Sequence, residues 1–216
     1  MKRKLTLEEN IFLVKRKLID SIYSCAKIER INVTFPETKA IVEGHATGNG
    51  NIPISEIEKI LNMRNAWKYT LENIDSPLTL DYACKINGYV AHNEALKPGE
   101  LRTGGVGIGG TKYIPAIPDK ANVEKEINTV LSEPDATKRA LKYFLTACRS
   151  QYFWDGNKRT SAICANKILI QNGGGIFIVP VAEIAIFDKT MIEFYENNDY
   201  DKALLYFADK IQTIEF

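Results

Sequence analysis

The sequence has no long hydrophobic run and no excess of charge of either sign. No apolar stretch approaches the roughly 20 residues that a membrane-spanning helix needs. Charged residues also interrupt the apolar positions that follow the basic N-terminus, so we expect no signal peptide. With 28 basic and 27 acidic residues the net charge is +1, which provides no overall field for nucleic acid or an anionic membrane. We therefore predict a soluble protein with no nucleic acid and no membrane among its partners.

Cysteine and histidine are scarce and scattered. The four cysteines stand far apart, at Cys25, Cys84, Cys148 and Cys164. Because none of them forms a C-x-x-C pair, the sequence argues against a zinc site and against a disulfide scaffold. Reduced cysteines fit a cytoplasmic location, which we predict. The two histidines, His45 in a Gly-rich loop and His92 at the end of a predicted helix, are both expected at the surface.

Helical periodicity dominates what the sequence does contain. The chain of 216 residues is 45% hydrophobic, enough for the core of one domain, and we predict a single domain over residues 1–216. Helices are expected at about residues 7–29, 55–75, 80–92, 123–131, 136–149 and 159–170, with two more between 182 and 211. Ser55 and Glu58 match a capping box at the start of the second helix. A break is expected at Phe35-Pro36, before a short apolar piece at 40–42.

The stretch from residue 97 to residue 118 has short β-like pieces between glycines and prolines, as expected of a hairpin. Within it, Gly105, Gly107 and Gly110 match G-x-G-x-x-G, which holds a pyrophosphate in a nucleotide-binding βαβ unit. The context does not fit, because no buried strand precedes the glycines and Pro115 and Pro118 follow where the helix would begin. We therefore interpret the segment as a hairpin, and the fold class as mainly α.

The segment QYFWDGNKRT, residues 151–160, concentrates groups that suit a phosphate and a metal ion. It precedes a predicted helix, whose unpaired N–H groups and dipole favour an anion. Gly156 lets the backbone bend, while Lys158 and Arg159 offer charged donors to phosphate oxygens. Asp155 would repel a bare phosphate but suits a phosphate-bound Mg²⁺. The alternative is an ordinary Asp-Gly-Asn turn with solvated cations, and Phe153 is interpreted as a core anchor for the loop.

FWDGNKRT resembles the central motif of the Fic/Doc family, H-x-F-x-[D/E]-[G/A]-N-[G/K]-R, which lies between two helices. The resemblance covers about residues 38–175. Residues 96–118 are similar to the family's flap hairpin, which lines up a target segment, and residues 62–93 to the helix pair before it. The resemblance implies a Fic-like helical bundle with a β-hairpin flap. It also implies ATP-dependent modification of a protein hydroxyl, most often AMP transfer.

The resemblance further implies roles for single residues and a division of the chain. Asp155 would hold Mg²⁺. The phosphates of ATP, or of another nucleoside triphosphate, would be bound by Gly156, Asn157, Lys158 and Arg159. A protein target would lie against the flap residues Gly105, Val106, Gly107 and Ile108. Residues 55–175 would be the Fic core, between an N-terminal part (1–50) with a possible inhibitory segment and C-terminal helices (176–216). The oligomeric state stays open, with a homo-oligomer possible.

The sequence departs from the family's pattern at three positions. The family's histidine, a general base that takes the proton of the attacking hydroxyl, falls on Gln151, and an amide cannot accept that proton. Lys158 replaces a glycine of most AMP-transferring members and matches the Doc branch, whose members transfer the terminal phosphate. Ala162 stands where a second arginine usually pairs with an inhibitory glutamate. Glu43 matches that glutamate, although Lys39 stands where the family has Ser or Thr.

We therefore predict a protein that binds ATP and Mg²⁺ at residues 155–159 and whose AMP-transfer chemistry is impaired or altered by Gln151. Two alternatives stay open. The first is an active phosphotransferase of Doc type, since phosphoryl transfer depends mainly on positioning and charge neutralisation. The second is a non-catalytic binding protein that uses the flap to hold a partner. For Glu43, an inhibitory residue and an ordinary helix-end residue are the two interpretations.

Overall fold

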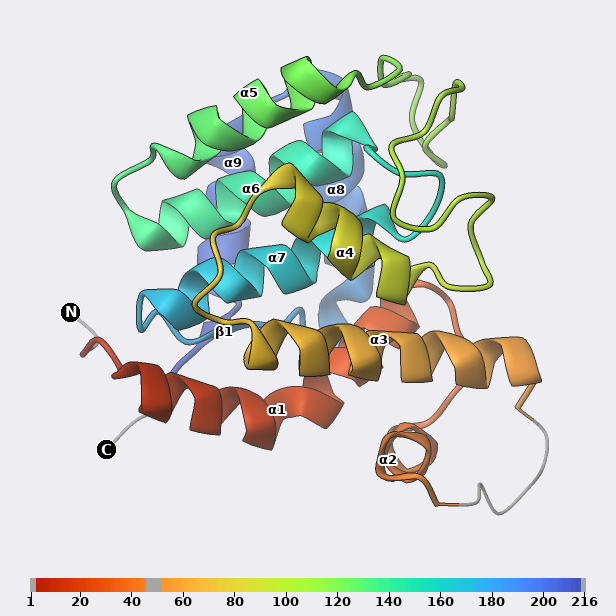
Figure 1. Cartoon of the computed structure of the whole chain (residues 1–216), viewed down its shortest axis with the longest axis vertical. Coiled ribbons are helices and arrows are strands. Elements are labelled where there is room, and N and C mark those ends of the chain that lie inside the picture. Colours follow the sequence, from red (N-terminus) through yellow and green to blue (C-terminus); the bar gives the residue numbers. More distant parts are fainter. Residues whose placement is uncertain (1–2, 46–51, 215–216) are drawn as a thin grey trace.

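The computed structural model describes residues 3–45 and 52–214 (Figure 1). Its elements are α1 (Leu7–Ile28), α2 (Phe35–Glu43), α3 (Ile54–Glu72), α4 (Leu80–Val90), α5 (Lys120–Leu131), α6 (Ala136–Ser150), α7 (Asn157–Gln171), β1 (Ile176–Phe177), the short 3-10 helix η1 (Val181–Glu183), α8 (Ile184–Asn197), α9 (Tyr200–Ala208) and β2 (Ile211–Gln212). The mainly α fold class is thus confirmed. None of these helices is long and apolar enough to cross a lipid bilayer within the described ranges.

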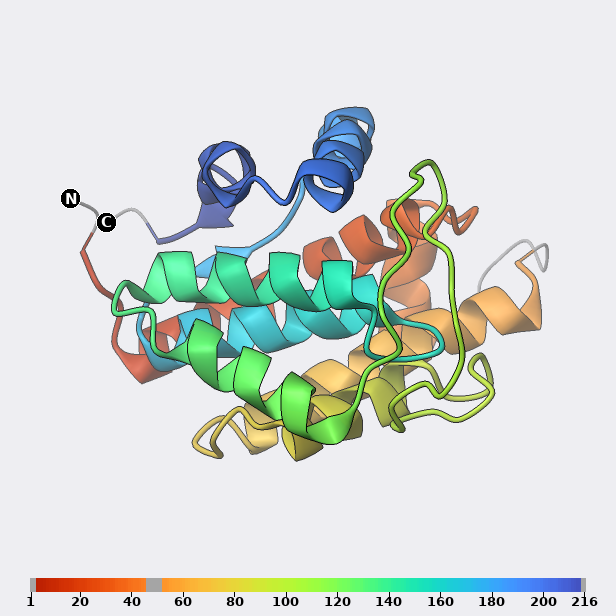
Figure 2. The same cartoon turned by 90° about the horizontal axis from the view of Figure 1, so that it is seen from above.

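Two neighbouring helices, α6 and α7, form the centre of the molecule. They lie side by side, with α3, α4 and α5 on one side and α8 and α9 on the other (Figure 2). α7 is buried along most of its length although its sequence is polar, because its side chains bond to backbone groups. The Asn166 amide exchanges hydrogen bonds of 3.0 and 2.7 Å with the backbone of Phe177 in β1. This pair ties the C-terminal part of the chain to the core.

Two expectations about helix starts in the N-terminal part were wrong. Phe35-Pro36 is no break, because Thr34 caps α2 and Pro36 lies in the first turn, where a missing N–H costs nothing. Ser55 does not cap α3 either, since the helix begins one residue earlier and Pro53 is its N-cap without a side-chain hydrogen bond. The predicted break between the two C-terminal helices is confirmed at Asn198, which has a left-handed conformation.

Residues 102–118, called the flap below, leave the helical core and double back on themselves (Figure 2). The chain reverses near residues 108–111, where the Thr111 N–H donates to the Ile108 carbonyl at 3.4 Å. No ladder joins the two limbs, and the flap's base is held instead by a bridge between Leu101 and Phe153. In the described residues the antiparallel strand pair is β1–β2, which lies outside the flap.

Lys167 of α7 supports the end of α3 from inside the core. Its side chain is 0% exposed, and its Nζ donates to the Asn73 carbonyl at 3.1 Å and to that of Ile74. The same nitrogen lies 4.7 Å from the centroid of the Tyr82 ring. Burial lowers the pKa of Lys167 to about 8.

This buried lysine predicts a pH-dependent difference in stability between the wild-type protein and Lys167→Met. Because the folded pKa of about 8 lies below the ordinary 10.5, the unfolded chain binds more protons between these values. The wild-type unfolding free energy should therefore rise relative to that of the variant as pH increases from about 8 to 10. Urea unfolding of both proteins at several pH values measures this difference. A constant difference would show that the two carbonyls and the Tyr82 ring keep the lysine charged.

Candidate functional site

A cavity of about 580 Å³ lies over the N-terminus of α7, between the loop 151–156, the flap and α8. It brings together most of the residues that the sequence singled out. Its lining includes the loop and helix residues Gln151, Asp155, Gly156, Asn157 and Lys158 and the flap residues Val106, Gly107 and Ile108. Of the predicted set, Gly105, Arg159 and Glu43 do not line it. The volume falls within the range of about 300–1,000 Å³ that is typical of small-ligand sites.

The loop before α7 is shaped by the side chain of Asn157. Its amide accepts from the Phe153 N–H at 2.9 Å and donates to the Phe153 carbonyl at 2.8 Å, while Phe153 itself is buried as expected of a core anchor. Gly156 is the N-cap of α7 with φ +73°, and a Cβ there would lie 2.8 Å from Val90. No side chain caps this helix. The first-turn N–H groups of α7 are therefore the donors that an anion can use.

Gln151, at the position of the expected base, is held by hydrogen bonds within the protein. It is the C-cap of α6 in a left-handed conformation, with φ 47°. Its Nε2 donates to the Cys148 carbonyl at 2.6 Å, and its Oε1 accepts from Asn157 Nδ2 at 3.0 Å. The side chain lines the cavity without offering a group that can take a proton near neutral pH.

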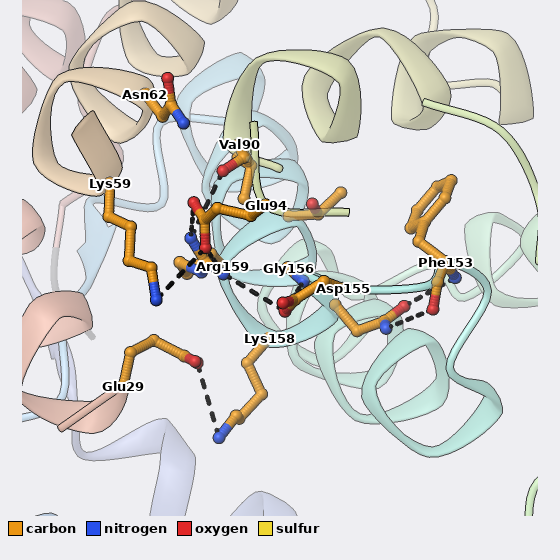
Figure 3. A network of polar contacts seen from close by, with 12 residues as sticks. Glu29, Lys59, Asn62, Val90, Glu94, Phe153, Asp155, Gly156, Lys158 and Arg159 are labelled. Atoms are coloured by element: carbon orange, nitrogen blue, oxygen red, sulfur yellow. Dashed lines mark hydrogen bonds and ion pairs between the residues drawn. The ribbon is translucent and has the colours of Figure 1, made fainter. Parts of the chain in front are cut away.

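The two cations of the motif have different surroundings (Figure 3). Arg159 is 2% exposed and forms a two-pronged ion pair with Glu94, at 2.8 and 2.9 Å. Burial lowers the pKa of Arg159, but the hydrogen bond to Glu94 and the nearby carboxylates outweigh this and raise it. Lys158 is 36% exposed, and its Nζ lies 3.5 Å from the Glu29 carboxylate. Lys158 is therefore the motif's accessible cation, whereas a phosphate would have to compete with Glu94 for Arg159.

Asp155 fits the predicted role as a magnesium ligand. Its carboxylate is half-exposed at the cavity, where Oδ1 accepts from the Gly156 N–H at 2.5 Å and lies 3.4 Å from Arg159 Nη2. In the described ranges no group of three or more His, Cys, Asp or Glu residues is arranged to hold a metal ion. A single carboxylate suits Mg²⁺ that keeps several waters and is bound largely through substrate phosphates.

Glu43 and the two histidines do not line this cavity. Glu43 ends α2, where its carboxylate lies 3.9 Å from Lys39 and 3.7 Å from His45. His45 and His92 are exposed, as the sequence predicted. Ala162 lines a small void of about 30 Å³ beside Glu29, which has room for a few water molecules at most and not for a nucleotide.

Sequence reasoning missed three groups, two that line the cavity and one, Glu94, that pairs with Arg159 beside it. Glu94 follows α4 and Glu29 follows α1, and neither stands in a motif. The third group is one face of α8, which contributes Met191, Ile192 and Tyr195 to the lining. The sequence pattern of α8 predicted an amphipathic helix but did not show which part of the core the helix would cover. Only the folded chain reveals these neighbours.

Proteins with related sequences are known. Residues 77–169 match the Fic/DOC family. The chain is 27% identical over 206 residues to the protein adenylyltransferase Fic of Nematostella vectensis, covering 88% of this chain and 43% of that protein. It is 29% identical over 177 residues to the protein adenylyltransferase Fic of Drosophila melanogaster, covering 77% of this chain and 35% of that protein. The chain thus spans less than half the length of these relatives.

Solved structures share the fold. Fic-1 from C. elegans has a TM-score of 0.73 at 19% identity, covering 92% of this chain and 62% of that one. A Fic domain containing signaling protein from Bacteroides thetaiotaomicron has a TM-score of 0.75 at 15% identity, covering 95% of this chain and 87% of that one. The predicted resemblance to the Fic/Doc family is therefore confirmed over residues 77–169, and the solved structures show that the chain shares the fold of Fic-domain proteins.

Proposed function

We propose that this chain binds ATP, or another nucleoside triphosphate, with Mg²⁺ in the cavity over α7. The observation that carries the proposal is the cavity itself, which joins an uncapped helix N-terminus, an accessible lysine and a carboxylate. The phosphates would lie on the first-turn N–H groups of α7 near Lys158, with Asp155 as the protein ligand of Mg²⁺. The apolar side chains of Met191 and Ile192 on α8 would pack against the nucleobase.

The proposed activity resembles the transfer of AMP to a protein hydroxyl, in an impaired or altered form. In such a transfer the hydroxyl oxygen attacks the α-phosphorus, pyrophosphate leaves, and the hydroxyl proton must go to a base. Gln151 cannot take this proton. The curated relatives are protein adenylyltransferases, and we extend their activity to this chain only as a proposal, with a protein target at the flap as substrate.

Lys158 favours a second candidate function, phosphoryl transfer. A lysine at the cavity can neutralise charge on a terminal phosphate, and phosphoryl transfer relies mainly on positioning and charge. Incubation with γ-labelled ATP tests this candidate, because label would reach protein from the γ-phosphate but not from the α-phosphate. A protein that binds the nucleotide and transfers neither label would be a nucleotide-dependent binding protein.

Calorimetric titration with ATP and Mg²⁺ tests the proposed site. We expect Asp155→Ala and Lys158→Ala each to weaken binding by about tenfold or more, since each removes a charged contact of roughly 1.5–3 kcal/mol. Matched controls are Glu124→Ala and Lys120→Ala, which remove an exposed ion pair of α5 away from the cavity. Absence of binding by the wild-type protein, or equal weakening in all four variants, would contradict the proposal.

Glu29→Gln is expected to strengthen nucleotide binding about two- to fivefold. In the protein alone the Glu29 carboxylate lies where it competes with a phosphate for Lys158, and a partly exposed ion pair contributes about 0.2–1 kcal/mol. The comparison is Glu43→Gln, measured by the same titration. A gain with Glu43→Gln and none with Glu29→Gln would assign the inhibitory role to α2, as the sequence resemblance suggests.

A further inference from the structure

Arg102 connects the flap to the loop that carries Gln151. Its side chain is 0% exposed. The guanidinium donates from Nε to the Gln151 carbonyl at 2.6 Å and from Nη1 to the Gly104 carbonyl at 2.6 Å. Nη2 reaches the carbonyls of Ala116 and Pro115 in the other limb. One side chain therefore joins both limbs of the flap to the end of α6.

The positive charge of Arg102 is balanced by backbone dipoles. In the described residues its hydrogen-bond partners are backbone carbonyls and not carboxylates, and burial lowers its pKa. Gln151 is the C-cap of α6, and Ser150, whose carbonyl lies 3.5 Å from Nη2, is the last residue of that helix. The negative end of the helix dipole therefore faces the guanidinium. The planar guanidinium, with its several N–H donors, can reach these carbonyls, which lie in different directions around it.

Two other side-chain anchors of the flap lie farther along it and do not contact the loop. Tyr113 stacks on Arg149 at 3.8 Å and accepts a hydrogen bond from it at 3.1 Å. Thr111 donates to Glu196 of α8 at 3.2 Å. These contacts hold the flap's tip and outer limb against α6 and α8. Arg102 differs because its hydrogen bonds end on Gln151 itself.

We propose that Arg102 is a positioning residue that sets the distance between the flap and Gln151. A target segment on the flap and a nucleotide on α7 would then meet in one fixed geometry. The inference rests on the proposed function for the target and the nucleotide. The hydrogen bonds of Arg102 to Gln151 and to both limbs of the flap, called the clamp below, are present in the protein without ligand. Removal of the clamp should therefore release the flap while leaving the nucleotide site formed.

Two local readouts test the clamp in Arg102→Met and Arg102→Lys. Trypsin cleavage after Lys112, an exposed flap residue, reports release of the flap, and cleavage after Lys125 in α5 reports general unfolding. Trp154 packs on the flap, since a Cβ on Gly104 would lie 2.8 Å from its ring. Acrylamide quenching of Trp154 therefore rises when the flap moves away. Trp67 is buried and contributes a constant fluorescence, which is measured by itself in the Trp154→Phe variant.

We expect Arg102→Met to be cut after Lys112 at least about tenfold faster than wild type, with greater quenching of Trp154. Cleavage after Lys125 and the affinity for Mg-ATP should stay within about threefold. Arg102→Lys should show a smaller change of the same kind, since it keeps the charge without the fork. The lysine variant decides the question if the methionine variant does not fold.

Unchanged cleavage after Lys112, or cleavage after Lys112 and Lys125 that rises in parallel, would overturn the proposal. The first result would mean that Arg102 does not hold the flap, and the second that it is a general stabilising residue. Loss of wild-type Mg-ATP binding would contradict the proposed function instead, because the cleavage and quenching results require no nucleotide.

Discussion

Gln151→His is expected to raise protein labelling from α-³²P-ATP by about 10²- to 10⁴-fold, the usual contribution of a general base. Gln151 lines the proposed nucleotide cavity, so an imidazole at this position would lie beside the reacting groups. Asn157 Nδ2 already donates to the Gln151 side chain at 3.0 Å and could make the same bond to a ring nitrogen. The measurement is transfer of label to the protein itself or to proteins of a lysate, compared with the wild type.

Two controls give this experiment its meaning. Gln151→Leu removes the amide without adding a base and should stay at the wild-type level. Gln151→His combined with Asp155→Ala should lose the gained labelling, because Mg²⁺ would lose its protein ligand. A silent Gln151→His that still binds Mg-ATP would contradict the expectation and show that the base is not the only defect. The next variants would then add Lys158→Gly and Ala162→Arg, the residues that most AMP-transferring members have at these positions.

The sequence predicted the helices other than α2, and the position of the motif, because both depend on local patterns. Apolar spacing and capping residues specify helices such as α1, where Thr6 and Glu9 form a capping box. The loop before α7 was equally predictable, since Gly156 and Asn157 act on their own neighbours. Local signals therefore located the floor of the cavity.

The partners of the motif's cations could not be predicted, because they come from distant parts of the chain. Glu94 lies 65 residues before Arg159, and Glu29 comes from the end of α1. A charged residue after a helix has many interpretations in sequence, and only packing selects one. The sequence likewise predicted a hairpin for the flap from its glycines and prolines. The flap has no ladder between its limbs, and buried Arg102 joins them through their carbonyls instead.

Glu94→Gln is expected to lower the unfolding free energy by about 3–5 kcal/mol, the usual cost of leaving one buried charge without its partner. Arg159 is 2% exposed, and Glu94 supplies both of its short charged hydrogen bonds. The remaining contacts, to the Val90 carbonyl and to Asp155, are 3.3 and 3.4 Å long. Urea unfolding followed by circular dichroism measures the loss.

A double-mutant cycle with Arg159→Met separates the ion pair from general damage. The double variant should recover much of the stability, because replacing both partners removes the unpaired charge. Lys59→Met is the matched control, since this lysine lies 3.6 Å from Glu94 at the edge of the network and should cost about 1 kcal/mol or less. Additive losses in the cycle would contradict the prediction.

The same variant decides between the two roles of Arg159. As a phosphate ligand, which the sequence resemblance implies, the guanidinium freed by Glu94→Gln would gain a partner in bound ATP. Mg-ATP would then raise the melting temperature of the variant more than that of the wild type, because binding linked to folding adds stability. If Arg159 is a purely structural residue, Mg-ATP would raise the melting temperatures of the variant and the wild type by the same amount. The large loss of stability is expected in either case, since it follows from the buried charge alone.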